Sequence, residues 1–174
     1  MGTRALIAYD TLYGNTEKVA RALEAGLREA GLETVCANAR EVAIDSLGRY
    51  DLICVGGPTE WLTASDPIKE FLGRLRGADL VGRAGFAFDT RLDRWLAGSA
   101  SRAIERELGK MGLRILRPRR SARVFLVKGR HGGAALKAGE EDRFSTLGRE
   151  LGTALLGGEA KACAEDLPAK ARVG

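Results

Sequence analysis

The chain has 174 residues, which suits one domain with a full hydrophobic core and is short for two. Hydrophobic residues make up 45% and charged residues 29%, as in ordinary globular proteins, and no apolar run approaches the roughly 20 residues of a membrane span. The formal net charge of +5 is compatible with acidic partners or anionic substrates.

Short apolar runs alternate with helical patterns along the chain. Five runs predict strands, at Ala5–Tyr9, Glu33–Ala37, Leu52–Val55, Gly85–Phe88 and Arg123–Val127. Apolar residues at helical spacing predict four helices, which carry Val19, Leu23 and Leu27; Ile68, Phe71, Leu72 and Leu75; Ile104, Leu108 and Met111; and Phe144, Leu147, Leu151 and Leu155. A short or irregular helix is predicted over residues 45–50.

The order of these elements predicts an α/β fold. Continuous apolar strands are typical of a parallel sheet that is covered on both faces, and the helices between them form right-handed crossovers. The last helix is expected to end at Gly157-Gly158, so residues 1–157 form one domain and 158–174 a flexible tail. The first residues lead directly into the first strand, so we expect no signal peptide and a cytoplasmic protein.

Cysteine and histidine give no sign of metal chemistry. The three cysteines and the single histidine lack the close spacing of a metal site or a disulfide framework. Cys36 and Cys54 lie inside apolar runs, so we expect both to be buried as small hydrophobic residues. No metal ligand is predicted.

The turn after the first strand predicts an anion site. Residues 11–16 read Thr-Leu-Tyr-Gly-Asn-Thr and open directly into a helical pattern. The first amides of a helix have no internal partner and lie at the positive end of its dipole, which makes them suited to a phosphate. The turn has neither the Gly-Lys-Ser/Thr ending of a nucleoside triphosphate loop nor the three glycines of a dinucleotide loop. The turn therefore suits a ligand with a single terminal phosphate.

This turn resembles the phosphate loop of the flavodoxin family, Thr/Ser-x-Thr-Gly-x-Thr, with Tyr13 in place of the middle threonine. Such a variant is similar to the flavodoxin modules of flavodiiron proteins. The resemblance implies a three-layer fold, a five-stranded parallel sheet of order 2-1-3-4-5, and bound FMN. Thr11, Asn15 and Thr16, with the loop amides, would hold the phosphate. The residues that the resemblance places there are Thr11, Leu12, Tyr13, Gly14, Asn15 and Thr16.

The segment after the third predicted strand reads Gly56-Gly57-Pro58-Thr59-Glu60-Trp61-Leu62-Thr63. The two glycines would let the backbone approach a ligand, and the Trp61 ring could stack on a flat one or pack against the following helix. The segment resembles the Gly-Ser-Pro-Thr and Gly-Thr-Pro-Thr loops that flank the isoalloxazine in flavodoxins. By that resemblance the flavin is lined by Pro58, Thr59, Glu60, Trp61 and Leu62.

The segment after the fourth predicted strand begins Phe88-Asp89-Thr90-Arg91-Leu92 and resembles the Phe-Asp-Thr-Arg stretch of one flavodoxin branch. Asp89, Thr90, Arg91 and Leu92 would then contact the second face and the pyrimidine edge. Arg91 would stabilise the anionic reduced flavin, or else pair with Asp89 or Asp93. Trp95 is a second stacking ring or covers a helix start. The tyrosine that many flavodoxins carry here is absent.

Basic residues gather between positions 114 and 130. They form either a solvated edge or a surface that steers an acidic redox partner or an anionic substrate. Interleaved aromatic residues and nucleic-acid motifs are lacking, so we expect no nucleic acid partner.

Together the three segments favour an FMN-binding electron-transfer protein in which no protein side chain needs to be catalytic. One alternative is an FMN-dependent NAD(P)H or quinone oxidoreductase, which would accept hydride. The other is a flavodoxin-like binding module that has lost FMN, which Tyr13 and the missing tyrosine would explain. A stable one-electron reduced state favours the carrier, and absent flavin affinity favours the module.

Overall fold

Five parallel strands form the middle of the structure. They are β1 (Arg4–Tyr9), β2 (Glu33–Asn38), β3 (Leu52–Glu60), β5 (Ala84–Leu92) and β7 (Arg120–Leu126). Their spatial order is β2-β1-β3-β5-β7, which confirms the predicted order 2-1-3-4-5. The computed structural model describes residues 2–93, 98–129 and 132–165, and for 159–165 the backbone alone.

Three short strands enlarge the sheet beyond the prediction. β4 (Thr63–Ala64) pairs antiparallel with the end of β3, and β6 (Arg114–Ile115) pairs with the start of β5. β8 (Ala134–Leu136) pairs antiparallel with β7. Strands of two or three residues carry no detectable periodicity, which explains why the sequence did not reveal them.

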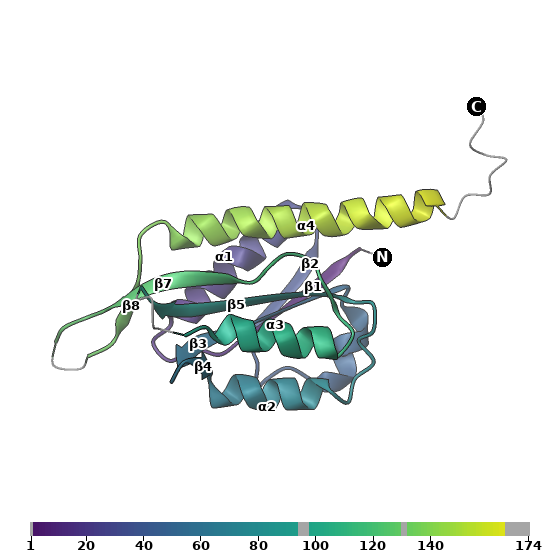
Figure 1. Cartoon of the computed structure of the whole chain (residues 1–174). Coiled ribbons are helices and arrows are strands. Elements are labelled where there is room, and N and C mark those ends of the chain that lie inside the picture. Colours follow the sequence, from purple (N-terminus) through teal and green to yellow (C-terminus); the bar gives the residue numbers. More distant parts are fainter. Residues whose placement is uncertain (1, 94–97, 130–131, 166–174) are drawn as a thin grey trace.

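Helices cover both faces of the sheet, as Figure 1 shows. α1 (Asn15–Glu29) and α4 (Glu140–Glu165) lie side by side on one face, and α2 (Asp66–Leu75) and α3 (Ala100–Lys110) lie on the other. A 3₁₀-helix, η1 (Ile44–Arg49), connects β2 to β3, in agreement with the short helix predicted there. Within the described residues, no helix has both the length and the apolarity that a membrane span requires.

The core consists of two apolar layers, one on each side of the sheet. Ile53 and Val55 of β3 face α2 and α3, whereas Leu52 and Cys54 face α1 and α4. This alternation follows from the strand geometry, in which successive side chains point to opposite faces. A strand buried on both faces is apolar throughout, which is why continuous apolar runs in the sequence predicted the strands of this sheet.

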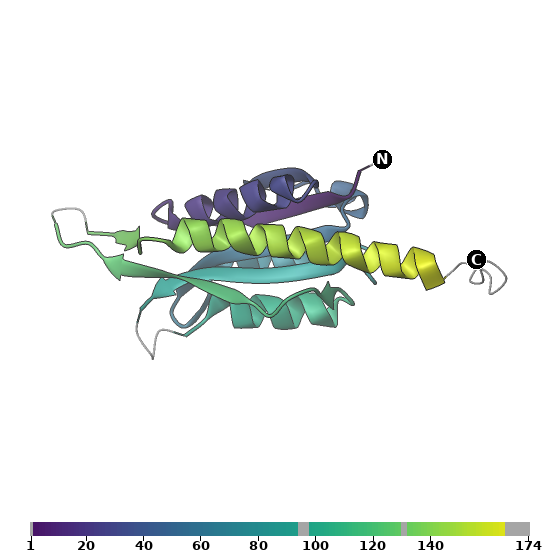
Figure 2. The ribbon, with the colours of Figure 1, turned by 90° about the horizontal axis from the view of Figure 1, so that it is seen from above.

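Glycines let α1 and α4 approach each other closely. A Cβ atom on Gly26 would overlap the carbonyl oxygen of Ser145, and one on Gly148 would overlap that of Leu23. A Cβ on Gly152 would lie 2.5 Å from the Cβ of Ala30. Figure 2 shows the two helices running next to each other over the sheet. Their spacing therefore depends on these residues lacking side chains.

Several boundaries differ from the prediction, and β3 and β5 extend to Glu60 and Leu92 instead of ending at Val55 and Phe88. α4 does not end at Gly157-Gly158 but continues to Glu165, because glycine inside a helix costs only about 1 kcal/mol relative to alanine. Both β7 limits move toward the N-terminus, because Arg120 pairs with Phe88 and the apolar residue Val127 lies outside the ladder. The division into a domain of residues 1–157 and a tail remains a prediction, and 166–174 lie outside the described residues.

β7 and β8 form a projecting hairpin, which we call the arm (residues 120–129 and 132–137). Both views show it extending beyond the helical layers (Figures 1 and 2). Val124, Phe125 and Leu126 pair with Leu136, Ala135 and Ala134. The arm lies at the end of the sheet where β1, β3 and β5 have their carboxyl ends. β7 is parallel to β5, pairs with its last residue, Leu92, at Val124, and continues two residues further to Leu126.

Candidate functional site

A pocket of about 170 Å³ lies at the carboxyl ends of the strands. Ligands bind at this position in open parallel sheets, where the strand order reverses. Three predicted segments and the arm supply its walls: Thr11, Leu12, Tyr13, Asn15, Thr16, Pro58, Thr59, Glu60, Thr90, Arg91, Leu92, Val124, Leu126 and Ala134. Of the fifteen residues predicted for the site, eleven line this pocket, and Gly14, Trp61, Leu62 and Asp89 do not.

The turn before α1 presents one hydroxyl that has no partner. Thr16 Oγ1 lies 2.8 Å from Thr90 Oγ1, and Asn15 Nδ2 donates to the carbonyl oxygen of Ala134 at 2.7 Å. Thr11 Oγ1 is buried and has no hydrogen-bond partner within the described structure. A buried polar atom without a partner is uncommon in proteins. Its position beside the start of α1 fits a phosphate, which both the hydroxyl and the helix amides would contact.

Gly14 serves this turn through its backbone. Its φ of +80° lies in the left-handed region, and it is the residue that immediately precedes α1. Glycine adopts this conformation without the steric cost that a Cβ brings. The residue thus sets the direction in which the helix leaves the strand.

Trp61 does not line the pocket, and its exposure shows that it does not pack against the next helix. β3 continues to Glu60, and Glu60-Trp61-Leu62-Thr63 forms a tight hairpin turn into β4. Trp61 and Leu62 have φ of 45° and 71°, and the Trp61 side chain is 97% exposed. Non-glycine residues in this region carry about 1–2 kcal/mol of strain each. Pro58, Thr59 and Glu60 line the pocket from the strand itself.

Gly56 and Gly57 make room for core packing rather than for a ligand. Both are buried within β3. A Cβ on Gly56 would overlap the ring of Phe88, and one on Gly57 would lie 2.7 Å from Cγ1 of Ile68. The expectation that these glycines bring the backbone close to a ligand is therefore wrong.

Asp89 lies outside the pocket and caps a helix instead. The residue is fully buried, and its Oδ2 accepts hydrogen bonds from the Ser99 hydroxyl at 2.9 Å and the Ser101 amide at 2.8 Å. The Thr59 hydroxyl also donates to it at 3.2 Å. A carboxylate at the first turn of α3 is favourable because it satisfies unpaired amides at the positive end of the helix. β5 continues through this position, so Asp89 and Thr90 point to opposite faces of the sheet.

Arg91 lines the pocket and forms no ion pair with any residue that the structure describes. Its Nη1 donates to the carbonyl oxygen of Gly98 at 2.6 Å, and its Nε is buried without a partner. Asp93 binds Lys137 Nζ at 2.6 Å and Arg123 Nη1 at 3.6 Å instead. The hydrogen bond and charge of Lys137 lower the pKa of Asp93. Neither candidate aspartate therefore pairs with Arg91.

The arm supplies pocket residues that the sequence reasoning missed. Val124, Leu126 and Ala134 form one wall, although only the strand, and not its contact with the phosphate turn, was predicted. A possible signal was the apolar run at the end of a strand beside a glycine-rich connection. Trp95, the other expected stacking ring, lies outside the described residues.

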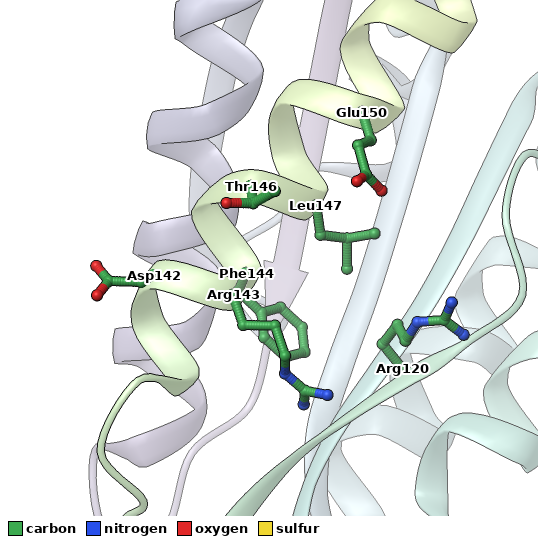
Figure 3. A pocket seen from close by; sticks show the side chains of 7 residues that line it. All are labelled: Arg120, Asp142, Arg143, Phe144, Thr146, Leu147 and Glu150. Atoms are coloured by element: carbon green, nitrogen blue, oxygen red, sulfur yellow. The ribbon is translucent and has the colours of Figure 1, made fainter.

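A second pocket, of about 330 Å³, lies between β7 and the first turns of α4 (Figure 3). Arg120 and Arg143 both belong to it, but Arg143 is bound to Glu140 at 2.6 Å and to the carbonyl oxygen of Ser121. Phe144 and Leu147 contribute to the core beneath it. Arg120 is then the one guanidinium of this pocket without an ion pair among the described residues, and a single cation does not make a defined anion site.

The prediction that both cysteines are buried is confirmed for Cys54 and only partly for Cys36. Cys54 is fully buried and Cys36 partly so, and burial raises the pKa of the Cys36 thiol to about 12. Burial also raises the pKa of Cys54. Both thiols are therefore protonated at neutral pH and poorly nucleophilic. Across the described ranges, no group of three His, Cys, Asp or Glu residues is arranged to hold a metal ion.

A parallel sheet of this order, with a turn from β1 directly into α1 and a pocket at the ends of β3 and β5, is the arrangement of flavodoxin-type proteins. The family model described as flavodoxin matches residues 7–146, and the chain belongs to the flavodoxin family. Members transfer electrons to partner proteins, and membership implies a flavin cofactor.

Solved structures have the same fold. A flavodoxin from the domain Archaea has a TM-score of 0.73 at 20% identity, over 88% of this chain and 99% of that one. Flavodoxin 1 of Bacillus cereus has a TM-score of 0.71 at 17% identity, over 86% and 97%. The flavodiiron protein of Giardia intestinalis has a TM-score of 0.72 at 20% identity, over 95% of this chain but 38% of its own length.

Proposed function

We propose that this protein binds FMN in the pocket at the strand ends and carries single electrons between proteins. The observation that carries the proposal is the buried, unpartnered hydroxyl of Thr11 beside the start of α1. That atom and the free amides of α1 match a phosphate, while the remaining walls are largely apolar or neutral, as a flat heterocycle requires.

We assign the phosphate and the ring of FMN to different residues of the pocket. Thr11, Asn15 and Thr16 bind the phosphate together with the turn amides. Pro58 and Thr59 on one side, and Thr90 to Leu92 on the other, hold the ring between the ends of β3 and β5. The bound flavin supplies the redox chemistry, and the protein supplies binding, orientation and charge.

The partner that we propose is an acidic redox protein, since the chain carries a net charge of +5. Opposite charges speed the encounter of two proteins and align their surfaces. The cytoplasmic location expected from the sequence remains a prediction.

The test is a visible spectrum of the purified protein, repeated after incubation with FMN and removal of free ligand. We expect retained flavin bands, and a much weaker affinity for riboflavin, which has the same ring without the phosphate. Absence of retained flavin at micromolar protein would contradict the proposal and favour the binding-module alternative. Equal affinity for FMN and riboflavin would contradict the assignment of the phosphate turn.

Arg91 supports a second candidate, an FMN-dependent NAD(P)H or quinone oxidoreductase. A cation that no described carboxylate neutralises favours an anionic reduced flavin, the product of two-electron reduction. Anaerobic mixing of the FMN-loaded protein with NADPH separates the two candidates. Rapid bleaching of the flavin bands supports the reductase, whereas slow or absent bleaching and a stable one-electron reduced state support the carrier.

A further inference from the structure

The arm has an unusual charge distribution. Residues 120–137, which contain the arm, hold five basic residues and no acidic one, namely Arg120, Arg123, Lys128, Arg130 and Lys137. Asp93 pairs with both Arg123 and Lys137 at the base of the arm, so one negative charge compensates two positive ones. Lys128 forms no ion pair within the described residues. The arm is therefore positively charged where it projects from the body.

The same segment exposes apolar side chains. Phe125, Leu126 and Val127 are 50%, 57% and 44% exposed. Leu12 and Tyr13 of the phosphate turn are also exposed, and a Cβ on Gly133 would lie 3.8 Å from the Tyr13 ring, so the two segments are neighbours. Apolar residues surrounded by charged ones are typical of protein interfaces and unusual on surfaces that only meet water.

This surface is continuous with the flavin pocket. A groove of about 360 Å³ is lined by Leu92, Asp93, Val124, Phe125, Leu126 and Lys128. Leu92, Val124 and Leu126 also line the flavin pocket, so the groove and the pocket share a wall. A protein seated on the arm would approach the cofactor directly, which electron transfer requires.

We propose that the arm is the docking surface for an acidic redox protein with an apolar centre, an inference that rests on the proposed function. A second copy of this chain does not fit, because two arms with five basic residues each and no acidic one would repel each other. A small anion would leave the three apolar residues uncovered. A protein of opposite charge covers the apolar residues and compensates the cations together.

The experiment uses the FMN-loaded, photoreduced protein and two haem proteins as probes, acidic cytochrome b5 and basic cytochrome c. We expect faster electron transfer to cytochrome b5, with a rate constant that falls about tenfold between low and moderate salt. Lys128→Glu should lower that rate several-fold and leave reduction of the small uncharged oxidant 1,4-benzoquinone unchanged. Arg49→Glu is the matched control, since Arg49 is exposed on η1, at the opposite end of the sheet.

Two results would overturn the docking proposal: a preference for cytochrome c, or equal losses from Lys128→Glu and Arg49→Glu. Failure to retain FMN would instead contradict the proposed function. In that case the docking surface is tested by titrating flavin-free protein with cytochrome b5. Weaker binding of Lys128→Glu than of Arg49→Glu supports the surface, and equal binding overturns it.

Discussion

Three neighbouring side chains of the phosphate turn have different hydrogen-bond states. Thr16 contacts Thr90, Asn15 contacts Ala134, and Thr11 alone has an unused buried hydroxyl. We expect Thr11→Val to weaken FMN binding by about 1.5–3 kcal/mol, because a hydrogen bond to a charged phosphate is lost. Flavin-fluorescence titration measures this loss.

The shape-matched control is Thr153→Val, on the exposed side of α4. It should leave the dissociation constant of FMN unchanged. An unaltered constant in Thr11→Val itself would exclude this hydroxyl from the phosphate site. In flavin-free protein Thr11→Val should be neutral or slightly stabilising, because it removes a buried unpaired polar group.

Arg91 is expected to favour the reduced flavin. A full charge in the pocket is worth about 1–2 kcal/mol toward an anionic ligand at intermediate dielectric and 8 Å. Arg91→Gln should therefore raise the dissociation constant of reduced FMN about 5- to 30-fold relative to that of oxidised FMN. Reductive titration of the loaded protein measures this ratio. Arg91→Lys keeps the charge, so the ratio of the two dissociation constants should stay close to that of the unsubstituted protein. Equal effects of both substitutions would mean that the packing of the Arg91 side chain, and not its charge, sets the ratio.

The role of Asp89 could not be predicted from the sequence. Its residue type and its distance from Phe88 fit a ligand contact as well as a helix cap. The register of β5 decides between them, because consecutive residues on a strand face opposite sides. Thr90 faces the side opposite to Asp89 and lines the pocket, whereas Arg91 shares the side of Asp89 and lines the pocket from near the end of the strand. The sequence did not reveal this because the strand extends beyond its apolar run.

At the scale of elements, the close approach of α1 and α4 gives a sharp stability test. Gly148→Ala places a methyl group against the carbonyl oxygen of Leu23, and overpacking of this kind costs about 1–3 kcal/mol. Gly73→Ala is the matched control, because Gly73 lies in α2 with open space around it. It should stabilise by up to about 1 kcal/mol through helix propensity. Urea unfolding of both variants checks the opposite signs.

The base of the arm should respond to acid. Lys137 lowers the pKa of Asp93 below its ordinary 3.8, so the ionised carboxylate favours the attached arm. That contribution is present above about pH 4 and is lost as the pH falls through the lowered pKa. The protection factor of the Lys137 amide, which donates to the carbonyl oxygen of Arg123, should therefore fall below pH 4. Asp93→Asn should show this lower protection at neutral pH, and an unchanged protection factor in that variant would show that the ion pair does not hold the arm.

Elements were predictable where burial is continuous. Strands β1 and β3 are apolar on both faces, and the four helices have clear apolar stripes, so their identity and order followed from the sequence. β7 was misplaced because its inward residues Ala122 and Val124 alternate with Ser121 and Arg123, while its most apolar run is exposed. The pocket wall made by Ala134 depends on a three-residue strand and one side-chain hydrogen bond. No local pattern encodes such a contact.

For the whole molecule, the cofactor should act as a stabiliser. A ligand that binds only the folded state at 100 times its dissociation constant stabilises by about 2.7 kcal/mol. For a domain of this size, that corresponds to a rise of about 5–10 °C in Tm. Scanning calorimetry with FMN tests this value, and riboflavin at the same concentration should give a smaller rise. Equal rises would mean that the phosphate adds no free energy.

The hydrogen bond from Asn15 to Ala134 joins the phosphate turn to the arm. One amide side chain thus belongs to the cofactor site and to the projecting hairpin together. If phosphate fixes Asn15, it also limits the positions of β8, and whatever holds β8 limits Asn15. Thermodynamic linkage makes this relation reciprocal, so a protein that binds the arm more tightly when FMN is present must raise the affinity for FMN by the same equilibrium factor. The molecule would then hold its cofactor most firmly during the encounter in which the cofactor is used.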